Sequence, residues 1–145
     1  MKLWFGYSSE HSSNLVMIGR FKEADKASKA KEIIELLTEQ VIADERAGFI
    51  KIGEGADRYT DDMLNLLQKV KVHSIGPAEL EQFAYDVTIK VKNNEVVLTT
   101  EEIEVSAFLK VLLNSGARVE VYSAHDYPET GHGRGSKLAA AREKL

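Results

Sequence analysis

Histidine and carboxylate residues lie near both ends of the chain, and these residue types can ligate a metal or transfer protons. Glu10 and His11 follow the first apolar residues, while His125 and Asp126 follow the last apolar segment. If the first and last strands were neighbours, two imidazoles and two carboxylates could meet there. Such a set could bind a divalent metal or form an acid–base pair, because histidine titrates near neutral pH. These four residues are therefore the catalytic candidates for a small metal-dependent or histidine-based hydrolase.

A second candidate site is the glycine-rich segment 131–137, which contains His132, Arg134 and Lys137. Alternating glycines allow backbone N–H groups to turn toward an anion, and the two cations add positive charge. These three residues are candidate ligand-binding residues for a nucleotide or nucleic acid. The P-loop spacing GxxxxGK(S/T) is absent, and a glycine-rich stretch near a C-terminus is typical of a flexible tail. The formal net charge of −4 also argues against nucleic acid as the partner.

The composition describes a folded chain that needs no covalent support. A chain of 145 residues fits one domain and can bury a core without a disulfide or a structural metal. There is no cysteine, which excludes disulfides and thiolate metal sites, and the sequence requires no cofactor. We expect residues 1–130 to form one globular domain and residues 131–145 to form a basic tail, flexible or short-helical. The run Lys137–Ala141 also resembles a vector-derived sequence.

Targeting signals are not evident in the sequence. The residues after Met1 form no apolar stretch of signal-peptide length, and no apolar run approaches the roughly 18 residues that span a bilayer. The sequence therefore predicts a cytoplasmic protein without a membrane partner.

Hydrophobic periodicity predicts two amphipathic helices. In the first, residues 24–46, apolar residues recur at spacings of three and four, and Gly48 is placed to end the helix. The second covers about residues 100–115, with Thr99 and Glu102 in the spacing of a capping box. Thr60 is the predicted N-cap of a shorter helix that ends near Lys71.

Alternating or continuous apolar runs predict the strands. The expected strands are residues 2–7, 14–21, 49–52, 85–92, 95–98 and 118–122. The second is apolar on both faces and is expected at the centre of the sheet. We expect an α+β fold: an antiparallel or mixed sheet with the two main amphipathic helices on one face.

The order of elements suggests two further interpretations. Residues 2–46 and 85–122 each begin with two strands and a helix, which suggests a duplicated ββα unit. Alternatively, if residues 70–75 form a strand, the C-terminal half has the order β-α-β-β-α-β, which resembles the ferredoxin-like split motif. This resemblance concerns element order alone and implies no function.

No segment carries a motif specific enough to name a reaction. The leading hypothesis is a non-enzymatic binding or interaction protein that works through its sheet or a loop edge. Its expected partner is another protein or a second copy of the chain, as in a homodimer. The hydrolase and the nucleotide-binding or nucleic-acid-binding protein remain as alternatives.

Overall fold

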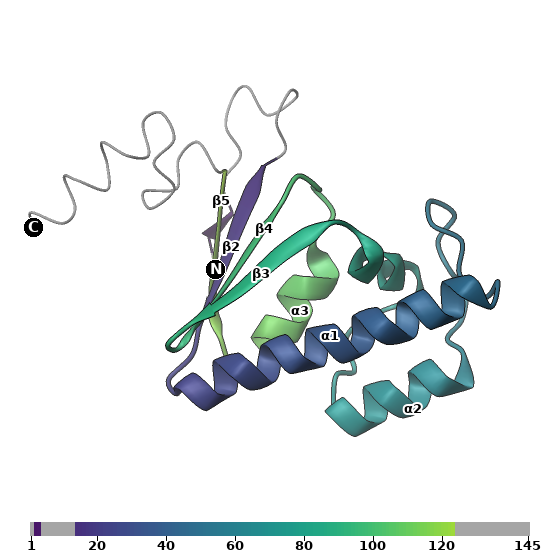
Figure 1. Ribbon diagram of the computed structural model, residues 1–145, viewed down its shortest axis with the longest axis horizontal. Coiled ribbons are helices and arrows are strands. Elements are labelled where there is room, and N and C mark those ends of the chain that lie inside the picture. Colours follow the sequence, from purple (N-terminus) through teal and green to yellow (C-terminus); the bar gives the residue numbers. More distant parts are fainter. Residues whose placement is uncertain (1, 4–13, 124–145) are drawn as a thin grey trace, which may run out of the picture.

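The computed structural model describes residues 2–3 and 14–123. These residues form an α+β fold in which the helices lie on one side of a five-stranded sheet (Figure 1). The strands are β1 (Lys2–Leu3), β2 (Leu15–Arg20), β3 (Val87–Lys92), β4 (Glu95–Thr100) and β5 (Arg118–Ser123). Their order in the sheet is β1-β5-β2-β4-β3. The pair β1–β5 is parallel and the other three neighbouring pairs are antiparallel, so the sheet is mixed.

The central position of β2 follows from its sequence. Its residues from Leu15 to Ile18 are all apolar and buried, as the continuous apolar run predicts for a strand with both faces covered. Leu15 and Met17 join the main core on the helical side. Val16 and Ile18 form a smaller cluster on the opposite face.

Four helices are present among the described residues. They are α1 (Ala24–Arg46), α2 (Asp61–Val70), the 3₁₀ helix η1 (Pro77–Ala84) and α3 (Ser106–Asn114). The predicted bounds of the first helix are confirmed, and Gly48 adopts a positive φ of 86° just beyond its end. Thr60 caps α2 as predicted, because its hydroxyl accepts a hydrogen bond from the Met63 N–H at 3.1 Å.

Two crossovers bring these helices to one face. Strands β2 and β3 both run antiparallel to β4, so they are parallel to each other, and α1 lies in the connection between them. In the same way β4 and β5 flank β2, and α3 connects them. Helix α1 packs against β3 and β4, α3 packs against β2 and β5, and α2 packs on α1 (Figure 1). Phe83 of η1 and Phe108 of α3 meet edge to face, with ring centroids 5.1 Å apart.

The six polar residues between the first two predicted strands suggest a hairpin, and this pairing is wrong. Lys2 and Leu3 pair in parallel with Glu120 and Val121, so β5 lies between β1 and β2. The first unit of the suggested ββα duplication therefore has no hairpin.

The predicted strand 49–52, and the strand 70–75 on which the ferredoxin-like interpretation depends, are absent from the described chain. In the run 49–52 the side chain of Ile50 is buried, but Phe49 is 68% exposed and no strand pairs with the run. Val70 is the last residue of α2, and residues 71–75 form a turn and an irregular connection. Alternation over a few apolar residues could not distinguish a strand from such a buried connection.

The second main helix begins later than predicted. Thr99 lies within β4, and α3 starts at Ser106. The Thr100 hydroxyl accepts a hydrogen bond from the Glu102 N–H at 3.1 Å and donates to the Asp86 carbonyl at 3.0 Å. The threonine pair therefore ends a strand, and residues 101–105 form a loop that leads into the helix.

No helix in the described ranges, 2–3 and 14–123, is both long and apolar enough to cross a membrane.

Candidate functional site

An apolar cleft of about 490 Å³ opens beside the start of α3. Its floor includes Met17 of β2 and Val121 of β5, which are opposite each other in the sheet. Apolar side chains of the 101–105 loop and α3 form its walls, with Ile103 57% exposed. Leu109 of α3 also lines the cleft. A volume of this size is within the usual range of small-molecule sites, about 300–1,000 Å³.

Polar side chains of η1 and α3 form a hydrogen-bonded network in one wall of the cleft. Ser106 Oγ donates to Glu79 Oε2 at 2.5 Å, and Glu79 Oε1 accepts from Lys110 Nζ at 2.6 Å. The Gly76 N–H donates to the same Oε1 at 2.9 Å. Gln82 is buried and accepts from the Ala107 N–H at 2.8 Å, which satisfies a free donor of the first turn of α3. The network therefore joins η1 to α3.

The protonation of Glu79 limits what the network can do chemically. Partial burial is the largest single influence on the pKa of Glu79 and raises it, because a carboxylate loses hydration there. Hydrogen bonds from Lys110, Ser106 and the Gly76 N–H together outweigh burial and hold the pKa below its ordinary value. Glu79 is therefore ionised at neutral pH and is a weak base toward the Ser106 hydroxyl. The arrangement suits orientation of the cleft wall better than activation of a serine nucleophile.

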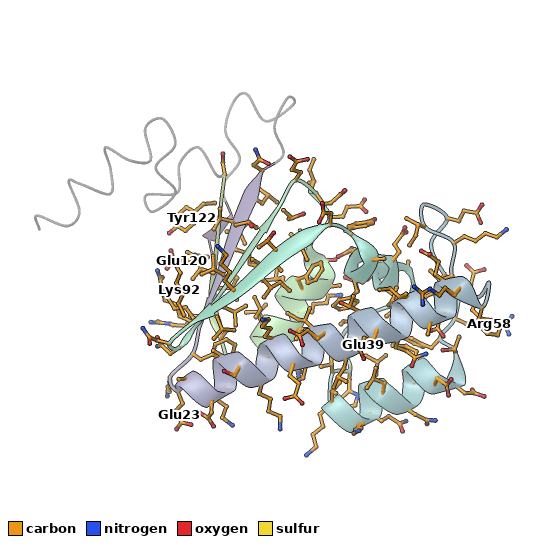
Figure 2. The ribbon with its side chains drawn as sticks, viewed as in Figure 1. Glu23, Glu39, Arg58, Lys92, Glu120 and Tyr122 are labelled. Carbon is orange, nitrogen blue, oxygen red and sulfur yellow. The ribbon has the colours of Figure 1, made fainter. Side chains whose placement is uncertain are left out.

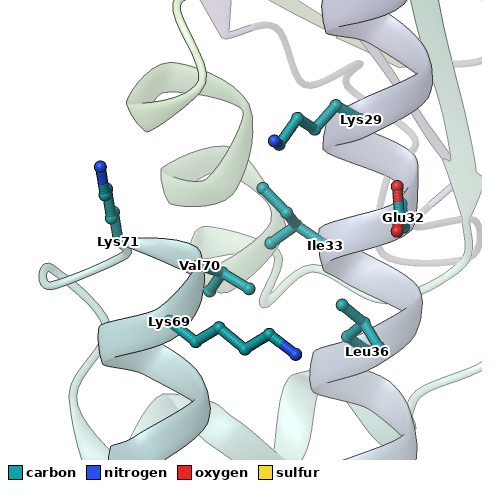
Figure 3. Close-up of a pocket in the computed structure, with 7 residues that line it drawn as sticks. All are labelled: Lys29, Glu32, Ile33, Leu36, Lys69, Val70 and Lys71. Carbon is teal, nitrogen blue, oxygen red and sulfur yellow. The ribbon is translucent and has the colours of Figure 1, made fainter.

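A second hollow, of about 280 Å³, lies between α1 and α2. Figure 3 shows Lys29 and Lys69 on either side of the apolar side chains of Ile33 and Val70. Lys71 follows the end of α2 in a left-handed conformation, with a φ of 60°. The C-terminal end of a helix carries partial negative charge, which lysines complement and which disfavours an anion. We therefore interpret Lys69 and Lys71 as charges that complement the end of α2 and not as an anion site.

The residues predicted as functional from the sequence lie outside the described ranges. These are Glu10, His11, His125, Asp126, His132, Arg134 and Lys137. The described residues next to the two segments do share one end of the sheet, since Leu15 is opposite Ser123 and Leu3 is opposite Val121. Among residues 2–3 and 14–123, no group of three or more His, Asp or Glu side chains could hold a metal.

A family model matches residues 1–134 of the chain. The chain belongs to the Family of unknown function (DUF6375). The part shared with DUF6375 includes the whole cleft and the candidates from Glu10 to Arg134, whereas Lys137 lies beyond it. Searches of curated proteins and of solved structures give no significant match.

Sequence reasoning missed the cleft. Its network joins Glu79 to Ser106 and Lys110, which lie 27 and 31 positions later, and no spacing rule relates such distant residues. The sequence signal for part of this network is local. Gly76 and Pro77 begin a helix, and Glu79 in its first turn accepts a hydrogen bond from the Gly76 N–H.

Proposed function

We propose that this protein is a small binding protein without catalytic activity, and that its ligand occupies the cleft between η1, the 101–105 loop, α3 and the sheet. The observation that carries the proposal is the cleft itself, an apolar hollow of about 490 Å³ with a few polar groups in its wall. Pockets of this kind are the usual binding sites for small molecules. The binding surface is therefore still a loop edge, and the ligand is a small molecule with an apolar body.

Two further features favour binding over catalysis. The polar groups of η1 and α3 in the wall are hydrogen-bonded to one another. They therefore fix the shape of the cleft, and a ligand would bind through the apolar surface. Ile103 lines the cleft and is 57% exposed, and a ligand in the cleft would cover part of that exposed surface.

The proposal is tested by titrating the protein with phenylbutanol, a neutral apolar probe, and following backbone amide chemical shifts by NMR. We expect saturable shifts around Leu109 and Val121. Ile103→Ala should weaken binding several-fold, because roughly 1 kcal/mol of apolar contact is lost. Leu113→Ala is the matched control, since Leu113 is also an exposed apolar residue but does not line the cleft. Shifts that do not saturate, or that are equal in both variants, would contradict the proposal.

The hydrolase that uses Glu10, His11, His125 and Asp126 is a second candidate. What favours it is the position of Leu3, Leu15 and Ser123 at one end of the sheet, because the segments that carry the four residues begin there. The discriminating quantity is the distance between the imidazoles of His11 and His125. Imidazoles too far apart for one metal or one reacting atom would exclude this candidate.

We also propose that strands β2 to β5 form a ferredoxin-like unit. The support is the order β-α-β-β-α-β that starts at β2, together with the sheet order β5-β2-β4-β3 and its antiparallel pairing. This unit begins at β2, whereas the interpretation from the sequence begins it at residues 70–75.

A cytoplasmic location and self-association remain proposals, and gel filtration with light scattering would test the latter.

A further inference from the structure

The charged side chains that line the cleft, among the described residues, are carboxylates. Among the described residues that line it, two are carboxylates, Glu79 and Glu104, and none is a lysine or an arginine. Glu79 is neutralised by Lys110, whose ammonium lies 2.6 Å from its carboxylate. Glu104 is exposed and forms no ion pair with any residue in the described part of the chain. Within the described ranges, the cleft therefore has one carboxylate at its edge, Glu104, that no cationic side chain compensates.

The surroundings of Glu104 add negative charge. The 101–105 loop also carries Glu101 and Glu102, and the Tyr85 hydroxyl donates to Glu104 Oε2 at 3.3 Å. The pKa of Tyr85 is raised, first by burial and then by the charges of Glu81, Glu104 and Glu102. Burial at Tyr85 disfavours any charge, but the negative charges of the glutamates also favour a cation in their neighbourhood.

We propose that the ligand of the cleft is an amphipathic organic cation, with an apolar body on Met17, Val121 and Leu109 and an ammonium group at Glu104. The inference rests on the proposed function and names the chemical class of its ligand. Apolar contact provides most of the affinity, because most of the exposed surface of the lining is apolar. The ion pair with Glu104 adds selectivity for a cation. Its contribution to affinity is small, since Glu104 is exposed to water and screened by salt.

The size of the selectivity follows from the exposure of Glu104. An exposed ion pair contributes little, so an ammonium should bind only about three-fold more tightly than a neutral analogue with the same apolar body. A carboxylate analogue should bind more weakly than the neutral one, because Glu104 and its neighbours repel it.

Three probes with the same phenylbutyl body test the inference: phenylbutylammonium, phenylbutanol and phenylpentanoate. Dissociation constants come from amide chemical shifts of the full chain at low and high salt. We expect the order ammonium, alcohol, carboxylate, with differences that shrink at high salt. Glu104→Gln should remove the advantage of the ammonium over the alcohol and leave alcohol binding unchanged. Glu39→Gln, at an exposed position of α1 (Figure 2), is the matched control and should keep all three constants.

Each outcome decides one claim. Equal binding of the ammonium and the alcohol, or an ammonium preference that survives Glu104→Gln, would overturn the inference while the cleft remains a binding site. Stronger binding of the carboxylate would also overturn it. Binding of none of the three probes would remove the proposed function together with the inference.

Discussion

Glu79 shows how one residue joins local capping to long-range packing. It accepts hydrogen bonds from the Gly76 N–H at the start of its own helix and from Ser106 and Lys110 of α3. Because these donors hold its folded-state pKa below the ordinary value of 4.5, ionised Glu79 stabilises the fold. This stabilisation is complete above about pH 4.5 and is lost as the pH falls through the lower folded-state pKa.

Glu79→Gln should therefore lower the free energy of unfolding by roughly 1–2 kcal/mol at pH 7, because the bonds to a charged acceptor are weakened. The difference from the unmodified protein should shrink toward zero at acidic pH, where Glu79 is protonated. Urea denaturation at several pH values measures it, and Glu39→Gln is the control for a glutamate on an exposed helix face. A difference that does not depend on pH would show that packing, and not charge, explains the loss.

At the scale of elements, prediction succeeded where one local pattern determines the structure. Helix α1 has an unbroken apolar stripe, and β3 alternates apolar and polar residues, so their periods identify both. Prediction failed for residues 49–52 and 70–75, where Ile50, Val72 and Ile75 are buried by tertiary contacts without a strand partner. The cleft could not be predicted because it forms where η1, the 101–105 loop and α3 come together. No local sequence pattern indicates which elements pack against one another.

The N-cap residue of α2, Thr60, also forms a hydrogen bond to Asp44 of α1. Thr60 Oγ1 accepts from the Met63 N–H and donates to Asp44 Oδ2 of α1 at 3.0 Å. Asp44 is buried and also accepts from Gln40 Nε2 at 3.0 Å. One hydroxyl therefore caps one helix and partly satisfies a buried carboxylate of another.

Thr60→Ala should destabilise the protein by about 1–2 kcal/mol, because the cap is lost and Asp44 loses a donor. Thr60→Ser keeps the hydroxyl and should stay within about 0.5 kcal/mol of the unmodified protein. The midpoints of urea unfolding distinguish the two variants. An unchanged midpoint in Thr60→Ala would mean that water replaces both interactions at no cost.

At the scale of the whole molecule, the separation of sheet and helices depends on one glycine of the central strand. A Cβ atom on Gly19 would lie 3.2 and 3.3 Å from the two δ-methyl groups of Leu112 in α3, and 3.4 Å from Ala117 Cβ. Leu112 is completely buried, so it has no free space into which to move. The absent side chain of Gly19 therefore lets α3 pack closely on β2, which also places Leu109 and Met17 around the cleft.

Gly19→Ala should destabilise the protein by about 1 kcal/mol or more. Replacing glycine lowers the conformational entropy of the unfolded chain, which favours folding, but the overcrowding in the folded state outweighs this effect. Leu112→Ala alone should cost about 2–5 kcal/mol through the cavity that it leaves. In the double variant the new methyl group occupies part of that cavity, so Gly19→Ala should be neutral or stabilising there. A double-mutant cycle of unfolding free energies measures this coupling, which should exceed about 1 kcal/mol. Additive effects would show that α3 can shift away from the sheet, and phenylbutanol binding to Gly19→Ala would then reveal whether the cleft changes with it.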